Sequence, residues 1–342
     1  MNVSLLRKLV QLAAFVFLVY GSVVVGFYSA DKLSGAFPVL ACAYDVQTAD
    51  YCTLIPFQHQ MDHRLGAAIV AGTSVLAALM PTLITLATFL VLFVLLNKAF
   101  CGWVCPLGFF QEVMGMLGQK LGLQRAASLS QATVRRVRPV KWVILVVLVF
   151  GIPVLAGMGL LDHSLGSPYC SICPSRILTT LASGNGSQLV LDTSSAGALV
   201  LSLTGALLFG LTASLSMKMR QPFCRVCPML AMHAVFRKLG LVRLIKNAKP
   251  RCEKCGLCAE ACPMDIREIH TEMTKKDVTF EDCTLCGRCV EFCPDQDVLQ
   301  LKYAFVPVFS ADPRYFKQRK KAQSRWEGGN LLAWWRAHRE RV

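Results

Sequence analysis

The sequence predicts a mainly α-helical membrane protein, with a bundle of four transmembrane helices followed by a small cysteine-rich α+β domain. Composition is the first observation behind this prediction: 54% of the 342 residues are hydrophobic and only 17% are charged, which is too apolar for a soluble chain of this length. The second observation is four long uncharged runs, because about 30 Å of hydrocarbon takes roughly 20 helical residues to cross. The third is a cysteine motif that occurs twice near the C-terminus.

The four uncharged runs are the candidate spans. The first is longer than the hydrophobic region of a signal peptide and has no small-residue cleavage site close behind it, so we expect it to be retained. The second is overlong and has Pro81 near its middle, which favours one tilted or kinked span over two short ones. The runs are Leu9–Tyr28, Ala67–Leu96, Trp142–Leu161 and Ala196–Met217.

Basic residues predict the orientation of these spans. Arg7 and Lys8 precede the first span, and the segment between the second and third spans carries seven basic residues against one acid, Glu112. By the positive-inside rule, both segments face the cytoplasm. We therefore expect a multi-pass protein of the bacterial inner membrane whose N-terminus and C-terminal domain are cytoplasmic. The net charge of +15 comes mostly from these segments and a basic tail, so no nucleic-acid partner is needed to explain it.

The repeated C-terminal motif has the spacing of a two-cluster ferredoxin. Each copy reads Cys-x2-Cys-x2-Cys-x3-Cys-Pro, at 252–263 and 283–294. In such motifs three cysteines bind one 4Fe-4S cluster and the fourth binds the other cluster. Zinc ribbons and disulfide frameworks lack this crossed spacing. The predicted ligands are Cys252, Cys255, Cys258 and Cys293 for the first cluster, and Cys283, Cys286, Cys289 and Cys262 for the second.

The other eight cysteines fall in four pairs near the ends of the spans. The order helix, outer pair, helix, inner pair occurs twice, and each copy ends in Lys-Leu-Gly-Leu, at 120–123 and 238–241. This predicts two parallel repeats. We expect repeats at 1–125 and 138–245, a dicluster ferredoxin domain at 246–305 and a basic tail at 306–342. The pairs are Cys42 and Cys52, Cys101 and Cys105, Cys170 and Cys173, and Cys224 and Cys227.

Face-to-face packing of the repeats would gather four thiols at each membrane surface. For the inner set (Cys101, Cys105, Cys224, Cys227) we expect a third 4Fe-4S cluster, with a redox dithiol or simple packing as alternatives. For the outer set (Cys42, Cys52, Cys170, Cys173) a fourth cluster competes with disulfides or a dithiol, because the outer compartment is oxidising.

Histidines and acids suggest further sites. His63, His163 and Asp162 fall near the outer face, where they could handle protons at a quinone site, with Asp62 as a further candidate. Haem held by His63 and His163, or solvated loop histidines, are alternatives. Acids of the ferredoxin segment favour either docking of a basic redox partner or a solvated face. They include Glu253, Glu260, Asp265, Glu281, Asp282 and Glu291.

Together the motifs resemble one known family. Cys101-Gly-Trp-Val-Cys105-Pro-Leu-Gly after a helix, Cys227-Pro228 after a later helix and the C-terminal dicluster motif are similar to the NapH/MauN/NosR group of membrane ferredoxin-type proteins. The resemblance covers about residues 9 to 303. It implies a lipid-embedded protein that passes electrons between the quinone pool or a cytoplasmic donor and a periplasmic ferredoxin, cytochrome or oxidoreductase.

Two other functions stay open at this point. An assembly factor could use the same clusters while a periplasmic metalloenzyme matures, and a redox-sensing membrane protein could use them to signal. The sequence contains no nucleophile triad, phosphate-binding loop or dinucleotide motif. We therefore expect an electron-transfer subunit, with quinol oxidation as its conceivable chemistry, rather than a stand-alone catalyst.

Overall fold

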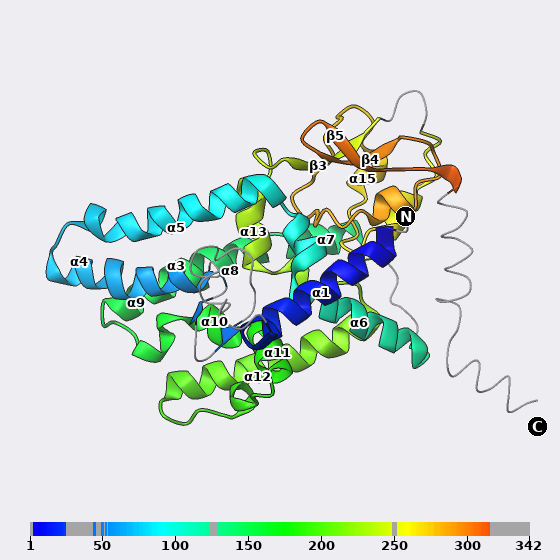
Figure 1. Cartoon of the computed structure of the whole chain (residues 1–342). Helices are drawn as coiled ribbons and strands as arrows, with labels where there is room; N and C mark the ends of the chain where they lie inside the picture. Colours follow the sequence, from blue (N-terminus) through cyan, green and yellow to red (C-terminus); the bar gives the residue numbers. More distant parts are fainter. Residues whose placement is uncertain are drawn as a thin grey trace, which may run out of the picture.

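The computed structural model describes residues 3–24, 44–45, 49–50, 52, 54–123, 129–247 and 252–314. The described chain is mostly helical, with a small sheet at one end (Figure 1). Within it, three helices are long and apolar enough to span a membrane, at 75–96, 131–157 and 196–218. The sequence predicted four spans. The first predicted span falls on α1 (Val3–Val24), and its last residues, 25–28, lie outside the described part.

The helices before the C-terminal domain are mostly short and joined by tight turns. Those after α1 are α3 (Leu54–Gln60), α4 (Ala67–Ala71), α5 (Val75–Leu96), α6 (Pro106–Lys120), α7 (Gln131–Val137), α8 (Val140–Ile144), α9 (Ile152–Gly157), α10 (Pro168–Ile172), α11 (Pro174–Ala182), α12 (Ala196–Lys218) and α13 (Pro228–Val235). Short π- or 3-10-helical turns connect them: η1 (Met61–Gly66), η2 (Phe100–Val104), η3 (Leu145–Gly151), η4 (His163–Gly166), η5 (Ser187–Leu189) and η6 (Phe223–Arg225). Residues Tyr44–Asp45 (β1) and Ala49–Asp50 (β2) form a two-residue antiparallel pair.

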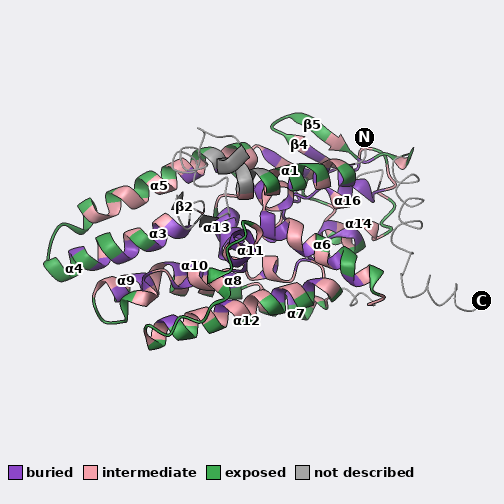
Figure 2. Ribbon diagram, turned by 60° about the horizontal axis from the view of Figure 1, so that its bottom comes forward, coloured by how far each residue is buried: buried purple, intermediate pink, exposed green. Residues whose placement is uncertain are grey.

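Most residues of the long helices α5 and α12 are exposed or half-buried (Figure 2), and many of the exposed ones are apolar. Leu76 of α5 is 70% exposed and Leu207 of α12 is 64% exposed. Water would disfavour two helices whose outer faces are leucine, alanine and valine, whereas hydrocarbon does not. The prediction of a membrane protein is therefore confirmed.

The second predicted span differs from the structure, because the chain turns within it. Gly72 adopts a left-handed conformation with φ of 64°, and the Ser74 side chain accepts a hydrogen bond from the amide of Ala77 at the start of α5. These are a helix stop and an N-cap. The uncharged run is therefore interrupted at residues 72–74 and not at Pro81, which lies inside α5. Residues 54–71 instead form a separate helical segment that packs against α5.

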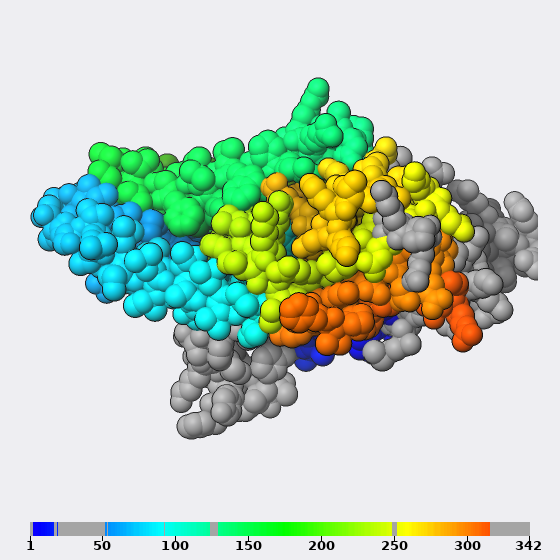
Figure 3. All heavy atoms as spheres, turned by 90° about the horizontal axis from the view of Figure 1, so that it is seen from above, coloured from blue at the N-terminus to red at the C-terminus, as the bar shows by residue number. Residues whose placement is uncertain are grey.

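The C-terminal domain combines a three-stranded antiparallel sheet with short helices. Strands β3 (Val242–Lys246), β4 (Leu299–Tyr303) and β5 (Val306–Ser310) lie in the order β3-β4-β5, so the sheet begins before the first motif cysteine and ends after the last. The helices are α14 (Leu257–Ala261), α15 (Glu268–Thr271) and α16 (Arg288–Glu291). In Figure 3 this domain, coloured yellow to orange, occupies one end of the molecule, and the other helices extend away from it.

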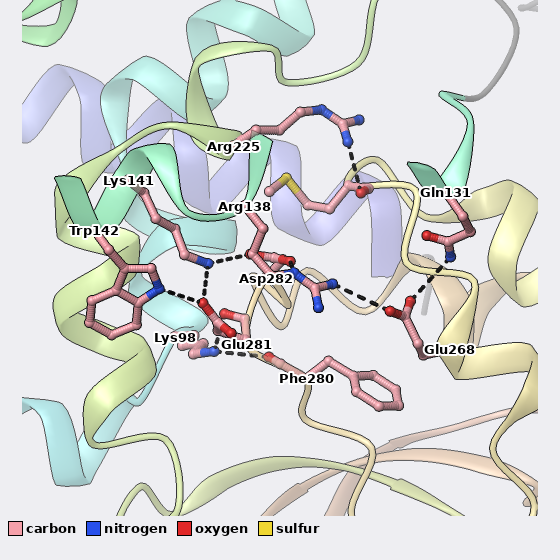
Figure 4. A network of polar contacts seen from close by, with 11 residues as sticks. Lys98, Gln131, Arg138, Lys141, Trp142, Arg225, Glu268, Phe280, Glu281 and Asp282 are labelled. Atoms are coloured by element: carbon pink, nitrogen blue, oxygen red, sulfur yellow. Dashed lines mark hydrogen bonds and ion pairs between the residues drawn. The ribbon is translucent and has the colours of Figure 1, made fainter. Parts of the chain in front are cut away.

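Buried ion pairs hold this domain against the helices (Figure 4). The Lys141 ammonium is fully buried and contacts the carboxylates of Glu281, at 2.8 Å, and Asp282. Arg138 Nε donates to the second of these carboxylates, Asp282, at 2.6 Å. On a neighbouring element, Arg225 donates to Asp265 Oδ2 at 2.7 Å and to the carbonyl of Met264 at 2.9 Å.

For four of the six acids, this interface corrects the prediction of a docking face or a solvated face; Glu253 and Glu260 are exposed. Asp265, Glu281 and Asp282 bind basic residues of the same chain, and Glu291 accepts a hydrogen bond of 2.6 Å from the Ser4 hydroxyl of α1. Spacing within the ferredoxin motif could not reveal this, because the basic partners lie 40 or more residues earlier in the chain.

We predict that Lys141→Met destabilises the protein by about 3–5 kcal/mol, because it leaves the partly buried Glu281 without its cation and Asp282 with Arg138 alone. The measurement is thermal unfolding in detergent, followed by circular dichroism. Lys276→Met is the control, since Lys276 is exposed on the domain surface. Equal unfolding temperatures for the two variants would contradict the buried ion-pair interface.

Candidate metal centres

Two cavities inside the C-terminal domain are each lined by four motif cysteines. The empty volumes are about 280 Å³ and 320 Å³. Each cavity takes three cysteines from one copy of the motif and the last cysteine from the other copy. This is the crossed arrangement that the spacing predicts. The first cavity is lined by Cys252, Cys255, Cys258 and Cys293, and the second by Cys262, Cys283, Cys286 and Cys289.

The chemistry of these thiols fits a metal cluster. Burial raises the pKa of Cys258 to about 11 and that of Cys262 to about 12. Such thiols stay protonated at neutral pH unless a cation compensates the charge of the thiolate. A 4Fe-4S cluster takes four thiolates and, when bound, supplies one-electron redox chemistry. Four buried thiols around one cavity are therefore a suitable donor set.

The inner cysteines are also brought together. Burial raises the pKa of Cys101, and the neighbouring thiols of Cys105, Cys227 and Cys224 raise it further, so the four side chains share one electrostatic site. Pro106 follows one pair and begins α6, and Pro228 follows the other and begins α13. A proline at the first helical position gives up no backbone hydrogen bond, so each pair is held by a rigid helix start.

The outer cysteines lie much closer to the inner set than expected. Cys52, Cys170 and Cys173 line a cavity of about 530 Å³ that Cys105 and Cys227 also line. The expectation of two thiol sets at opposite membrane faces is therefore wrong for the described residues. The remaining outer cysteine, Cys42, lies outside the described part of the chain.

One tyrosine lies between the two sets. The hydroxyl of Tyr169 is 3.9 Å from Cys173 Sγ and also 3.9 Å from Cys227 Sγ. Tyr169 is almost fully buried, at 4% exposure. Its ring therefore fills the space that separates the outer cysteines from the inner ones.

Short helices that fold back toward the interior explain this approach. A side chain added at Gly205 would lie 3.0 Å from the carbonyl oxygen of Ser171 and 3.4 Å from Ile172 Cα. Gly205 is near the middle of α12, a candidate span. The turn between Cys170 and Cys173 thus lies beside the middle of a membrane helix, because a glycine there permits close packing.

A glutamine fixes the outer set. Gln58 Nε2 donates to Cys170 Sγ at 2.8 Å, and Gln58 Oε1 accepts from the backbone amide of Tyr169 at 3.1 Å. Gln58 Nε2 also donates to the carbonyl of Leu54, one turn earlier in α3, at 3.0 Å. The Gln58 side chain therefore holds the sulfur of Cys170 and the backbone amide of the preceding residue, Tyr169.

A second glutamine repeats this arrangement at the inner set. Gln111 Nε2 donates to Cys224 Sγ at 3.3 Å and to the carbonyl of Leu107, and Gln111 Oε1 accepts from the amide of Phe223 at 3.1 Å. Neither glutamine was predicted as a functional residue from the sequence. The signal was present as Cys-x-Leu-x2-Phe-Gln at 52–58 and again at 105–111.

The inner set directly contacts the C-terminal domain. A side chain added at Gly102 would collide with the carbonyl oxygen of Thr284 and lie 2.9 Å from Cys286 Cα. The neighbouring Trp103 Nε1 donates to the carbonyl of Leu285 at 3.0 Å. The loop carrying one inner pair therefore touches the loop carrying the second motif of the domain.

The predicted histidine site is partly assembled. The rings of His63 and His163 are 5.5 Å apart between centroids, and Asp62 lies beside them. Asp162 is not part of this group, because its carboxylate accepts a hydrogen bond from the amide of Ser164 at 3.1 Å and caps η4.

Comparisons with known proteins agree with this arrangement. The family model of a 4Fe-4S binding domain matches residues 78–124 and again 201–247, which contain the two inner cysteine pairs. The model of a 4Fe-4S dicluster domain matches residues 244–294. No solved structure matches the chain.

Three curated relatives are similar over more than half of the chain. The uncharacterized protein MJ0750 of Methanocaldococcus jannaschii is 29% identical over 64% of this chain and 78% of its own length. The putative electron transport protein YccM of Escherichia coli is 31% identical over 54% of this chain and 46% of its own length. The ferredoxin-type protein NapH of Haemophilus influenzae is 28% identical over 58% of this chain and 60% of its own length. The chain thus spans about half of the second relative and three fifths of the third.

We predict that Gly102→Ala lowers the free energy of unfolding by about 1–3 kcal/mol, because its methyl group would overlap backbone atoms that cannot rotate away. The measurement is thermal unfolding in detergent. Gly210→Ala is the matched control, since a side chain at this helical glycine would meet no atom within 4 Å. A loss at Gly210 equal to the loss at Gly102 would refute the close contact between the two loops.

Proposed function

We propose that this NapH-type membrane 4Fe-4S ferredoxin-like protein carries electrons between its C-terminal domain and the interior of the membrane through four 4Fe-4S centres. The homologues and both family models already assign it to electron-transport iron-sulfur proteins. The number of centres and their order are our proposal. The observation that carries it is the unbroken series of cysteine sets, each in contact with the next.

The series begins with the two cavities of the C-terminal domain. Their ligands are the crossed sets described above, so the two centres would share one small core, and this supports rapid exchange between them. The next step crosses the contact of Gly102 with Thr284 and Cys286. No flexible linker separates donor from acceptor there, because backbone touches backbone.

The last step runs within the shared membrane cavity. Cys105 and Cys227 belong to the inner set, Cys170 and Cys173 to the outer set, and all four line the same space. About 30 Å of hydrocarbon would be too wide for one efficient electron transfer. The position of the outer set near the middle of α12 removes this difficulty, because the step covers only part of the membrane.

The glutamines support a cluster rather than a disulfide at the outer set. Gln58 donates to the sulfur of Cys170 in the same way that Gln111 donates to the sulfur of Cys224. Gln111 and Cys224 both lie in segments that match a 4Fe-4S binding domain. Hydrogen bonds to sulfur stabilise a thiolate cluster and tune its potential. Such a device has no evident purpose for an oxidised cysteine pair. The same local architecture therefore argues for the same cofactor.

The exchange partners follow from where the series ends. We propose a cytoplasmic donor or acceptor at the C-terminal domain, and the quinone pool or a periplasmic redox protein at the outer set. Exposed Arg135 and Arg136 at the start of the second candidate span support a cytoplasmic location for that end.

We predict about sixteen iron atoms per chain in anaerobically purified protein, and about twelve in a Cys170→Ser, Cys173→Ser double variant. Four iron atoms are lost because one four-thiolate site is removed. The measurement is iron and acid-labile sulfide, with EPR of the reduced protein. The control is Ser171→Ala, which alters one of the two residues between the cysteines and should keep the full iron content. Equal iron in wild type and the double variant would eliminate the outer cluster.

We predict that Gln58→Leu lowers the reduction potential of the outer centre by about 40–60 mV and leaves the inner centre unchanged, whereas Gln111→Leu does the reverse. Hydrogen bonds to charged groups contribute about 1.5–3 kcal/mol, and the bond stabilises the more negative reduced cluster more than the oxidised one. If that difference is about 1–1.4 kcal/mol, the shift is about 40–60 mV, because 59 mV corresponds to about 1.4 kcal/mol for one electron. The measurement is an EPR-monitored redox titration. Gln60→Leu is the control, because the Gln60 side chain donates a hydrogen bond to the Thr85 hydroxyl and not to a cysteine. Unchanged potentials in both variants would show that the glutamines have only a packing role.

A further inference from the structure

We infer that Asp62, His63 and His163 form a binding site for one divalent transition-metal ion, separate from the cysteine sets. One potential ligand atom from each residue lies within 4.8 Å of the other two. The residues come from η1 and from η4, which follow α3 and α9 respectively. Helices α4 and α9 lie at the end of the molecule away from the sheet (Figure 1). The site is thus formed by two segments that are 100 residues apart in sequence.

Glycines bring these two segments together. A side chain at Gly66 would lie 2.7 Å from the backbone of Gly157, and one at Gly157 would collide with the carbonyl oxygen of Asp62. A side chain at Gly166 would collide with the Asp62 carboxylate itself. Larger residues at any of these positions would push η1 away from α9 and η4. The glycines therefore fix how far Asp62 lies from His163.

The local helix type also favours a site. Met61–Gly66 is a π-helical turn inside the helical segment 54–71. Single π-helical turns are rare and are often found at functional positions, because they shift side chains relative to an α-helix. This turn carries both Asp62 and His63.

The charge environment of Asp62 points to a cation. Asp62 is 4% exposed. Among the described residues, the basic group nearest to its carboxylate is the imidazole of His63, whose Nε2 lies 3.6 Å from Asp62 Oδ2. This distance is longer than a hydrogen bond, and histidine is charged only when protonated. A buried carboxylate without a close cation is costly. A bound metal ion would compensate it.

The donor types select the class of metal. Two imidazoles and one carboxylate are a ligand set for zinc and for ferrous iron, with further positions left for water. His63 is half exposed, at 52% of its side chain, so water can reach the ion. The ring of His59 stacks on His63 with centroids 5.6 Å apart and orients it. Calcium and magnesium are disfavoured, because they prefer oxygen ligands.

We test this site with the full-length protein, its clusters loaded anaerobically, in detergent. The protein is equilibrated with Zn²⁺, separated from unbound metal and assayed for zinc and iron together. We expect one zinc per wild-type chain above the level in a His63→Ala, His163→Ala double variant, and at least a tenfold weaker affinity in either single variant. Both histidines are exposed, so these variants should keep their iron, which reports an intact fold.

The Asp162→Asn variant is the matched control. It removes a carboxylate beside His163 that caps η4, so it should retain the zinc, whereas Asp62→Asn should lose it. Cu²⁺ bound to the wild type should also give an EPR spectrum with hyperfine coupling to two nitrogens. Zinc binding that is equal in the wild type and the histidine double variant, at equal iron content, would overturn the site. So would loss of zinc in Asp162→Asn but not in Asp62→Asn. Neither result depends on electron transfer, so the proposed function would stand or fall separately.

Discussion

A buried lysine between two carboxylates connects the two parts of this molecule. Lys141 belongs to a helix that continues into the membrane, and its partners Glu281 and Asp282 immediately precede the second cysteine motif. Because the ammonium is fully buried, the pair is not screened by water and defines one position of the domain. In that position Gly102 touches the backbone at Thr284. Every later step of the proposed electron route depends on this contact.

Depth in the membrane is the second constraint. Electron transfer across a bilayer would be inefficient if the metal centres lay at the two membrane surfaces, because about 30 Å of hydrocarbon would separate them. This fold avoids the difficulty with short helices that return to the interior, such as α10 and α11, which Gly205 allows to pack against α12. The polar groups of such segments must find partners inside the protein. Gln58 provides two of them, for the amide of Tyr169 and the sulfur of Cys170.

The sequence was informative wherever local spacing determines the result. The crossed cysteine sets of the C-terminal domain and the span at 196–218 follow from spacing and run length alone. The turn at Gly72 did not, because uncharged residues continue on both sides of it and hide the end of one helix and the start of the next. The cavity that Cys105 and Cys173 both line could not be predicted either, since it depends on tertiary packing such as that at Gly205. The glutamines could have been found, had the segments 52–58 and 105–111 been aligned.

The basic residues at the start of the second candidate span have a role that changes with time. During synthesis, Arg138 and Lys141 leave the ribosome more than 130 residues before their acidic partners, so they are uncompensated when the helix inserts. In the orientation proposed above, they would then act as the positive charges that retain this end of the helix in the cytoplasm. Once the C-terminal domain is made, Lys141 is buried at its interface and Arg138 is ion-paired there. Folding thus pairs the charges that direct insertion with carboxylates of the C-terminal domain. Reversing the topology would then require breaking these ion pairs.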